Sequence, residues 1–364
     1  MLRQPLAIAR GAALLTITLG LLGLLASPAL AHGRGSDATN YASVIRSAPE
    51  LPGVTWRVLG NDEYLELSNT SDAEVTVLGY EREEYLRVGP DGVFENRNSP
   101  AAYLNADRFG QSSVPPGADA EAEPDWVRVS DGTSHLWHDH RAHWMALEPP
   151  QPVQQDPSVT RVVLEWEVPF RYDGAAQVVA GDLSWIPPTS PLPWLLGAGV
   201  LTLPALAGLF TKPAGEERWP GLARPAAVLL GLLAAANLIH LGDDLFAVAL
   251  PLTTRAFAAV QTTLFILIAG FGALRGWQAR EGAFTAIGVG AAALLVGQGL
   301  LYAAVLSTSQ TASLWPSAVT RIVVALSLVQ ALPLGIVAVV GTRRLLPPLQ
   351  DADPESSEVA PAVT

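Results

Sequence analysis

The sequence contains no cysteine and a single lysine, Lys212. Without cysteine, the chain can form no disulfide and offers no thiolate, either as a nucleophile or as a metal ligand. Its 22 Lys and Arg residues stand against 34 Asp and Glu residues, for a formal net charge of −12. A nucleic-acid surface needs clustered Lys and Arg to pair with phosphates, so we expect no nucleic-acid partner.

Common hydrolase motifs are also missing. The chain has neither the HExxH pattern of zinc proteases nor the GxSxG turn that exposes a nucleophilic serine. The sequence therefore leaves open whether the protein is an enzyme, and it favours a non-enzymatic role.

Long apolar segments fill the C-terminal half. Residues 195–340 are nearly all Leu, Ala, Val and Gly between short charged breaks. Five segments, 194–210, 225–241, 256–274, 283–306 and 318–341, are each near the length of about 20 residues that a bilayer requires. We predict a helical transmembrane bundle of about five spans over residues 189–344, with the lipid bilayer as its surroundings.

The arginines of the connecting loops predict an orientation. Most of them fall in connections that alternate to one side of the membrane, whereas only Arg255 and Arg321 fall on the other. Because cytoplasmic loops are enriched in Lys and Arg, the sequence predicts a multi-pass plasma-membrane protein with an extracytoplasmic N-terminal domain. The acidic tail, residues 345–364, is expected to be disordered and cytoplasmic.

The first 31 residues have the pattern of a signal peptide. Arg3 and Arg10 precede a short apolar run, and the small-residue pattern Ala29-Leu30-Ala31 follows Pro28. Cleavage after Ala31 would make His32 the first residue of the mature chain. An uncleaved first helix is the alternative.

Residues 32–188 show the period-two alternation of strands. The clearest stretch is 160–168, in which Val162, Leu164, Trp166 and Val168 would share one buried face. Similar runs at 63–67, 74–78, 84–88, 126–129 and 177–185 are separated by turns rich in Gly, Asn, Asp and Pro. We predict an antiparallel, Ig-like β-sandwich.

Four of the six histidines lie in residues 134–145, of sequence SHLWHDHRAHWM. If this segment is a strand, His138 and His140 point to the same face, close enough to share a metal ion. Asp139 could be a ligand or orient an imidazole, and His135 and His143 are further candidates. With nitrogen and oxygen ligands alone, Cu(II) or Zn(II) suits the site. The alternative is a metal-free polar loop in which His138 and His143 bond to the backbone and Asp139 pairs with Arg141.

Two resemblances follow from these residues. An N-terminal His32 would offer its amine and ring nitrogen to copper, and this start, followed by a β-domain and a membrane bundle, resembles copper-resistance proteins of the CopC and CopD type. The strings HDHRAHWM and Trp166-Glu167-Val168-Pro169 resemble an uncharacterised family of exported membrane proteins from GC-rich bacteria. The first resemblance implies copper binding, and the second implies fold and location only.

Ionisable residues also occur inside the second apolar segment. His240 and Asp244 recur at helical spacing with Asn237, and Asp243 is adjacent. Such residues at membrane depth are candidates for function, here a second metal site or a proton-handling site. The alternative is an interfacial cap in which Asp243 or Asp244 pairs with Arg255.

The leading hypothesis is an extracytoplasmic metal-binding protein, most plausibly for copper, with zinc as the alternative. A metal-free assembly or sensory protein that binds another membrane protein is the second hypothesis. A metal-dependent enzyme is the third.

Overall fold

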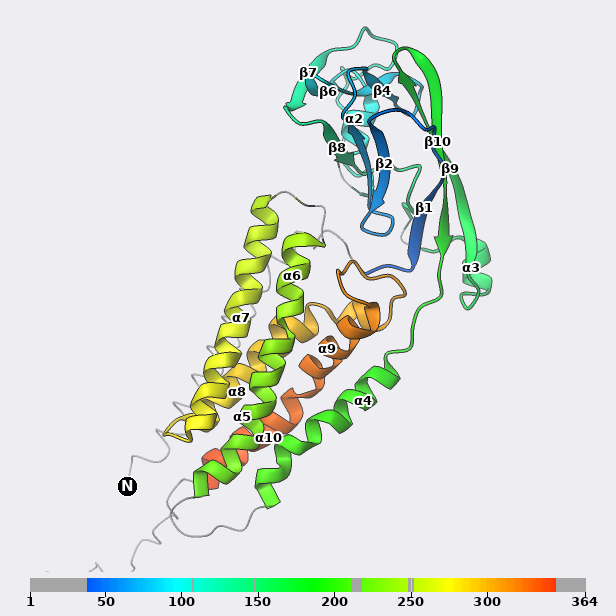
Figure 1. Cartoon of the computed structure of the whole chain (residues 1–364). Helices are drawn as coiled ribbons and strands as arrows, with labels where there is room; N and C mark the ends of the chain where they lie inside the picture. The colour runs from blue at the N-terminus through cyan, green and yellow to red at the C-terminus, as the bar shows by residue number, and fades with distance from the viewer. Residues whose placement is uncertain are drawn as a thin grey trace, which may run out of the picture.

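The computed structural model describes residues 38–106, 108–146, 148–210, 218–247, 250 and 252–344. The predicted signal peptide, His32 and the acidic tail lie outside these residues. The described chain has two parts, a β-domain at one end and a helical bundle below it (Figure 1).

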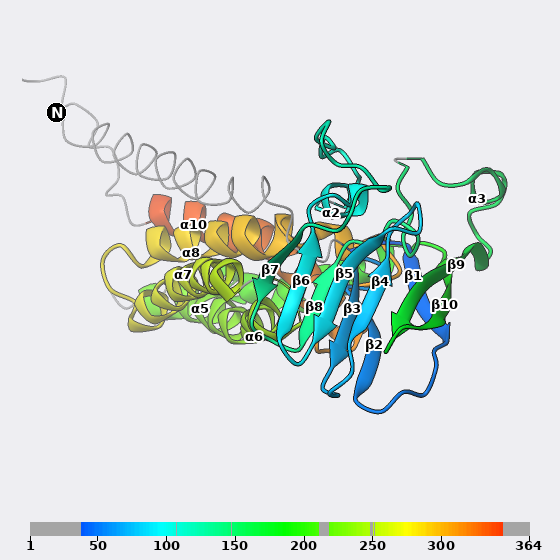
Figure 2. The same cartoon turned by 90° about the horizontal axis from the view of Figure 1, so that it is seen from above.

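Two antiparallel sheets make up the β-domain. A seven-stranded sheet has the order β1-β10-β9-β4-β5-β6-β7, and a three-stranded sheet has the order β2-β3-β8. The strands are β1 (Tyr41–Ser47), β2 (Val54–Leu59), β3 (Tyr64–Asn69), β4 (Val75–Leu78), β5 (Glu84–Gly89), β6 (Gly92–Asn96), β7 (Trp126–Ser130), β8 (Ser134–Trp137), β9 (Arg161–Tyr172) and β10 (Ala175–Trp185), with short helices α2 (Pro100–Leu104) and α3 (Gln151–Gln155) between them. The predicted two-sheet antiparallel fold is confirmed, and Figure 2 shows its strands from above.

The core of the β-domain is aromatic and lies between the two sheets. Trp56 of β2 packs against Trp137 of β8 and Phe170 of β9, with ring centroids 6.1 and 5.2 Å apart. Side chains that alternate along each strand supply this core, because successive residues point to opposite faces of a sheet. On β9 the buried set is Trp166, Val168 and Phe170.

The expected burial of Val162 is wrong. Its side chain is 53% exposed. Leu183 of β10 pairs with Leu164, but the next residue, Ser184, pairs with Val162, so the register shifts at Val163. This bulge reverses the faces of β9 beyond it, because one extra residue breaks the two-residue period.

Five helical segments are long and apolar enough to cross a membrane. They are Leu192–Phe210, Gly221–Phe246, Leu252–Gln278, Ala283–Leu300 and Ser317–Arg343. Their elements are α4 (Leu192–Thr202), η1 (Leu203–Phe210), α5 (Arg218–Ala236), α6 (Leu238–Phe246), α7 (Leu252–Gln278), α8 (Ala283–Leu294), η2 (Leu295–Leu300), η3 (Ala303–Leu306), α9 (Ser317–Val329) and α10 (Ala331–Arg344).

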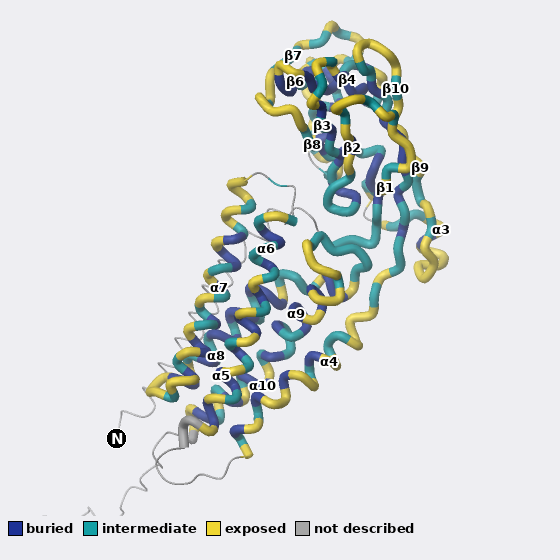
Figure 3. The backbone as a smooth tube through the Cα atoms, viewed as in Figure 1, coloured by how far each residue is buried: buried dark blue, intermediate teal, exposed yellow. Residues whose placement is uncertain are grey.

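Large apolar side chains remain exposed in the bundle, including Leu196, Leu232, Leu267 and Phe271. Figure 3 shows how exposed residues recur along its helices. Such a surface suits the acyl chains of a bilayer, since lipid is as apolar as leucine. The chain is therefore a multi-pass membrane protein, as the apolar segments predict.

The two parts are joined through the connection between η3 and α9. Thr39 and Gln310 exchange two backbone hydrogen bonds of 3.1 and 2.9 Å. The backbone N–H of Ser309 donates to Oδ1 of Asn40, and its hydroxyl donates to the carbonyl of Ile186, each at 2.9 Å. Both the start of β1 and the exit from β10 are thus bonded to one loop of the bundle.

Candidate functional site

The histidine-rich segment is a loop and not the strand that its spacing suggested. Strand β8 ends at Trp137, and the chain turns at once. The expectation that His138 and His140 share a strand face is therefore wrong. Turns and side-chain hydrogen bonds place the imidazoles of this loop.

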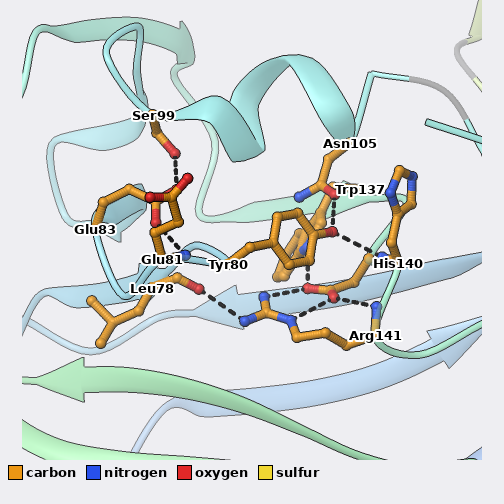
Figure 4. Close-up of polar contacts among 10 residues, drawn as sticks. Leu78, Tyr80, Glu81, Glu83, Ser99, Asn105, Trp137, His140 and Arg141 are labelled. Atoms are coloured by element: carbon orange, nitrogen blue, oxygen red, sulfur yellow. Dashed lines mark hydrogen bonds and ion pairs between the residues drawn. The ribbon is translucent and has the colours of Figure 1, made fainter. Parts of the chain in front are cut away.

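Asp139 anchors the loop. Its carboxylate accepts hydrogen bonds from Nε1 of Trp137 at 2.9 Å and from Nε and Nη2 of Arg141, both at 2.8 Å. Arg141 also donates to the carbonyl of Leu78 on β4 (Figure 4). Burial alone would raise the pKa of Asp139, but the charge of Arg141 and the hydrogen bonds from Arg141 and Trp137 hold it below its usual value. Asp139 thus holds the loop to the sheet, as the metal-free alternative expects.

Tyr80 fixes the backbone next to this anchor. The N–H of His140 donates to the Tyr80 hydroxyl at 3.0 Å, and that hydroxyl donates to Oδ1 of Asn105 (Figure 4). The His140 ring passes close to Gly110, whose φ is +61°: a Cβ built there would lie 2.8 Å from Cε1 of His140 and 3.0 Å from Cε of Met145. A glycine is needed here for both its backbone conformation and its lack of a side chain.

Three of the histidine rings lie together. The centroid of the His143 ring is 5.2 Å from that of His140 and 6.4 Å from that of His138. The His138 ring also packs on Tyr64, at 4.3 Å between centroids. We call His138, His140 and His143 the histidine cluster. His135 stacks on Trp137, and the ring contacts that join the cluster do not extend to it in the part of the chain that the structure describes.

Backbone carbonyls set the tautomers of two of these rings. Nδ1 of His138 lies 3.0 Å from the carbonyl oxygen of Glu63, and Nε2 of His143 lies 2.5 Å from that of Arg108. Since a carbonyl only accepts, each of these nitrogens carries the proton in the neutral ring, and the opposite nitrogen keeps its lone pair. Second-shell partners of metal-bound histidines act in the same way.

His143 is neutral at ordinary pH and buried. Its side chain is 1% exposed, and its Nδ1 has no hydrogen-bond partner among the described residues. Burial lowers the pKa of His143 to about 4, although the hydrogen bond to the Arg108 carbonyl acts in the opposite direction. A buried polar atom without a partner calls for an explanation, and an ion is one of them.

Acidic side chains lie beside the cluster, in the turn between β2 and β3. Nη2 of Arg108 lies 3.0 and 3.2 Å from the two carboxylate oxygens of Asp62, and Nη1 lies 3.9 Å from Oε2 of Glu63. Burial raises the pKa of Asp62 to about 6, against the lowering effect of Arg108. Two acids thus face one arginine here, an arrangement that favours a cation nearby.

Sequence reasoning did not find Asp62, Glu63, Tyr64 or Arg108. Glu63 is 75 residues from His138, and Arg108 is 35 residues from His143. A pair of acids in a turn between two strands is the only sequence signal for them, and such pairs are common on surfaces.

The two ring separations of the histidine cluster lie in the range of imidazoles that share a metal ion. Metal–nitrogen bonds are about 2.0 to 2.1 Å long, so rings that share an ion have centroids roughly 4.5 to 6.5 Å apart, which includes both observed distances. Yet no group of three or more His, Cys, Asp or Glu side chains among the described residues is placed to hold an ion as it stands. His32 lies outside the described residues and stays a prediction.

The structure also brings together the second candidate pair. His240 and Asp244 lie on α6, both buried, and Tyr302 links them: its ring stacks on His240 with centroids 4.1 Å apart, and its hydroxyl donates to Oδ1 of Asp244 at 3.0 Å. Asp243 accepts instead from Ser313, and Arg255 donates to the carbonyl of Leu245.

The fold and the two polar sites define a class of protein: a multi-pass membrane protein with a β-domain and buried histidines in both parts. No family model, curated protein or solved structure matches the chain.

Proposed function

We propose that this protein captures a metal ion, most favourably Cu(II), at the histidine cluster of an extracytoplasmic β-domain that the helical bundle anchors in the membrane. The observation that carries the proposal is the protonation pattern of the cluster. His138 and His143 each give one N–H to a backbone carbonyl, and the remaining nitrogen of His143 is buried without a hydrogen-bond partner in the described chain.

Ligand chemistry supports Cu(II) or Zn(II) rather than Cu(I). The mature chain offers neutral imidazoles and carboxylates but no thiolate, a donor set that Cu(II) and Zn(II) accept and that does not suit Cu(I)–thiolate chemistry. Small side-chain rotations, rather than a new backbone path, would bring His138 and His140 to the ion. Each of these rings already lies as far from the His143 ring as two imidazoles that share a metal ion. The carboxylates of Asp62 and Glu63 supply negative charge nearby.

The distribution of arginine supports the extracytoplasmic orientation. At the end of the bundle next to the β-domain, the described arginines are Arg255 and Arg321, and both donate to backbone carbonyls. Helices α5, α7 and α10 carry Arg224, Arg275 and Arg343 towards the opposite end (Figure 1). The positive-inside rule assigns that opposite end to the cytoplasm.

A titration of the full-length protein in detergent with Cu(II) tests the proposal, read by electron paramagnetic resonance. We expect one ion per chain with nitrogen hyperfine structure. The double variant His138→Gln/His143→Gln should lose this signal or weaken binding at least a hundredfold. His135→Gln is the matched control, since it removes a half-buried histidine of the same domain outside the cluster, and it should bind like wild type.

The proposal fails if the double variant, shown to be folded by circular dichroism, binds copper as tightly as wild type. Repeating the titration with Zn(II) tests the alternative ion.

A metal-free role is the second candidate, because Asp139 pairs with Arg141, and because His138 and His143 bond to carbonyls as a hydrogen-bonded loop requires. In that case the loop serves only to build a surface for another membrane protein. Equal metal content in wild type and the double variant would favour this candidate.

A further inference from the structure

Two of the membrane helices break at the same level of the bundle. The second span changes from α5 to α6 at Asn237, whose side-chain N–H donates to the carbonyl of Leu233 and to Ser327 on α9. The fourth span changes from α8 to the π-helical η2 and then to a turn at Tyr302. Irregular backbone at membrane depth is tolerated where protein surrounds it, and π-helical turns often occur at functional sites.

Polar side chains from three spans meet between these breaks. Asp244 accepts a hydrogen bond of 2.6 Å at Oδ2 from Thr262 of α7 and one of 3.0 Å at Oδ1 from Tyr302. The His240 ring lies flat on Tyr302, at an interplanar angle of 13°. His240 and Thr262 are fully buried, and Asp244 is 6% exposed. The described chain thus joins a carboxyl, a phenol and an imidazole in one contact series.

The neighbouring charged groups have separate structural contacts. Asp243 accepts 2.9 Å hydrogen bonds from the Ser313 hydroxyl and the Leu314 N–H, so it holds the loop that carries the β-domain. Arg255 of α7 donates to the carbonyl of Leu245, and Arg321 of α9 donates to the carbonyl of Val305. Among the described residues, these are the charged groups on the helices packed at this end of the bundle.

Two of the contacts of Asp244 are hydrogen bonds from hydroxyls, those of Thr262 and Tyr302. A hydroxyl stabilises a carboxylate by donating to it, and it can also rotate to accept from a protonated carboxyl. Ionisable groups buried in a membrane with such partners are typical of proton-binding sites.

We propose that Asp244, hydrogen-bonded by Thr262 and Tyr302 and backed by His240, is a proton-binding site near the β-domain end of the bundle. Asp244 lies two residues before the end of α6, so its proton exchanges with the side of the membrane that carries the β-domain. This site is independent of metal binding at the histidine cluster, and either can fail without the other.

Infrared difference spectroscopy of the full-length protein in lipid nanodiscs, between alkaline and acidic pH, tests the site. Wild type should gain the C=O stretching band of a protonated carboxyl. Because other carboxyls such as Asp62 take up protons in the same range, the contribution of Asp244 is read as the part of the band that wild type has and Asp244→Asn lacks. Asp243→Asn, the adjacent control in the same helix, should keep this part. The same Asp244→Asn protein should bind copper like wild type, which separates the two proposals.

Tyr302→Phe gives a second measurement that does not remove the acid. Without the Tyr302 hydroxyl, the Asp244 carboxylate loses one hydrogen-bond donor. The pH midpoint of the Asp244 part of the band should therefore rise by about one pH unit or more. A carboxyl band in folded Asp244→Asn that equals the wild-type band, or a midpoint that Tyr302→Phe leaves unchanged, would overturn the proposal.

Discussion

Two buried aspartates, one in each part of the molecule, are held in different ways. Asp139 in the β-domain is fixed by the guanidinium of Arg141, whereas Asp244 in the bundle accepts from the hydroxyls of Thr262 and Tyr302. A guanidinium stays charged at all ordinary pH, so its partner stays ionised and has a structural role. A hydroxyl can donate to an ionised carboxyl or accept from a protonated one, so the contacts with Thr262 and Tyr302 fit both states of Asp244. The two aspartates, both buried, thus differ in the kind of group that these contacts supply.

The buried histidines show a similar contrast. His143 donates to a backbone carbonyl and lies among other imidazoles, whereas His240 stacks on a tyrosine between helices. The first arrangement leaves the lone pair of His143 on Nδ1, within a group of imidazoles. The second places the His240 ring on Tyr302, whose hydroxyl donates to Asp244.

Replacing each aspartate by asparagine should give the largest difference between the two parts. Asp139→Asn leaves Arg141 buried without its counter-charge, and such a loss costs about 3 to 5 kcal/mol of unfolding free energy. Asp244→Asn should cost about 1 kcal/mol, because the amide oxygen still accepts from one hydroxyl and the amide NH2 can donate to the other. Thermal and denaturant unfolding of the full-length variants measures both.

The double variant Asp139→Leu/Arg141→Met is the control for the first substitution. It should recover most of the loss, since it removes the unpaired charge. Equal losses for the two asparagine variants would remove the distinction between structural and reactive acids.

The free energy of unfolding should depend on pH through groups of the β-domain. Burial lowers the pKa of His135 from 6.5 to about 4. The unfolded chain therefore binds this proton more tightly, so stability is full above pH 6.5 and falls as the pH drops towards 4, by up to about 3 kcal/mol.

Asp62 acts in the opposite direction, because its raised pKa makes the folded form the tighter proton binder between 3.8 and about 6. Denaturation midpoints at neutral pH and near pH 4, with chelator present, test both residues. His135→Gln should reduce the loss of stability between neutral pH and pH 4. If His135→Gln loses as much stability as wild type over this range, the loss does not come from His135.

One tightly packed glycine in each part of the molecule allows the packing of the two parts to be compared. A Cβ on Gly181 of β10 would lie 2.2 Å from the Trp166 ring and 2.4 Å from the backbone oxygen of Val44, and one on Gly297 of η2 would lie 2.1 Å from the Phe265 ring. Alanine at either position should destabilise by about 1 to 3 kcal/mol. We expect the larger effect at Gly181, because a backbone atom moves less readily than a ring.

Gly132 and Gly335 are the matched controls for these glycines. A Cβ on Gly335 would meet nothing within 4 Å, and one on Gly132 would meet only the Ser130 hydroxyl oxygen, at 3.3 Å. Thermal midpoints of the four alanine variants decide the comparison. A greater loss at Gly297 than at Gly181 would show that the bundle is the more rigidly packed part.

Much of the architecture was predictable from local pattern. Six of the strands lie close to the alternating stretches, and the five spans lie close to the apolar segments. Strands β1, β2 and β6 were missed, and β8 covers only the start of the histidine-rich segment that was considered as a strand. The break at Asn237 was missed as well, because a polar residue inside an apolar segment does not by itself show that a helix ends.

The candidate sites were predicted less completely. The sequence placed His138, His140 and His143 together because they are near neighbours in the chain, and it paired His240 with Asp244 from helical spacing. It could not assign Asp139 to Arg141 rather than to a metal, because both uses fit the same spacing. No pattern in the sequence indicated the contact between Tyr302 and Asp244, because that contact depends on how two spans pack.

The sequence by itself determined which segments cross a membrane and where six of the strands lie, because length, hydropathy and alternation are properties of a segment in its solvent. The tertiary structure decided which carbonyl fixes each imidazole and which hydroxyl meets each acid. Those contacts join residues as far apart as Glu63 and His138, or Asp244 and Tyr302, 75 and 58 positions along the chain. No local pattern encodes them, because they form only when the sheets and helices pack.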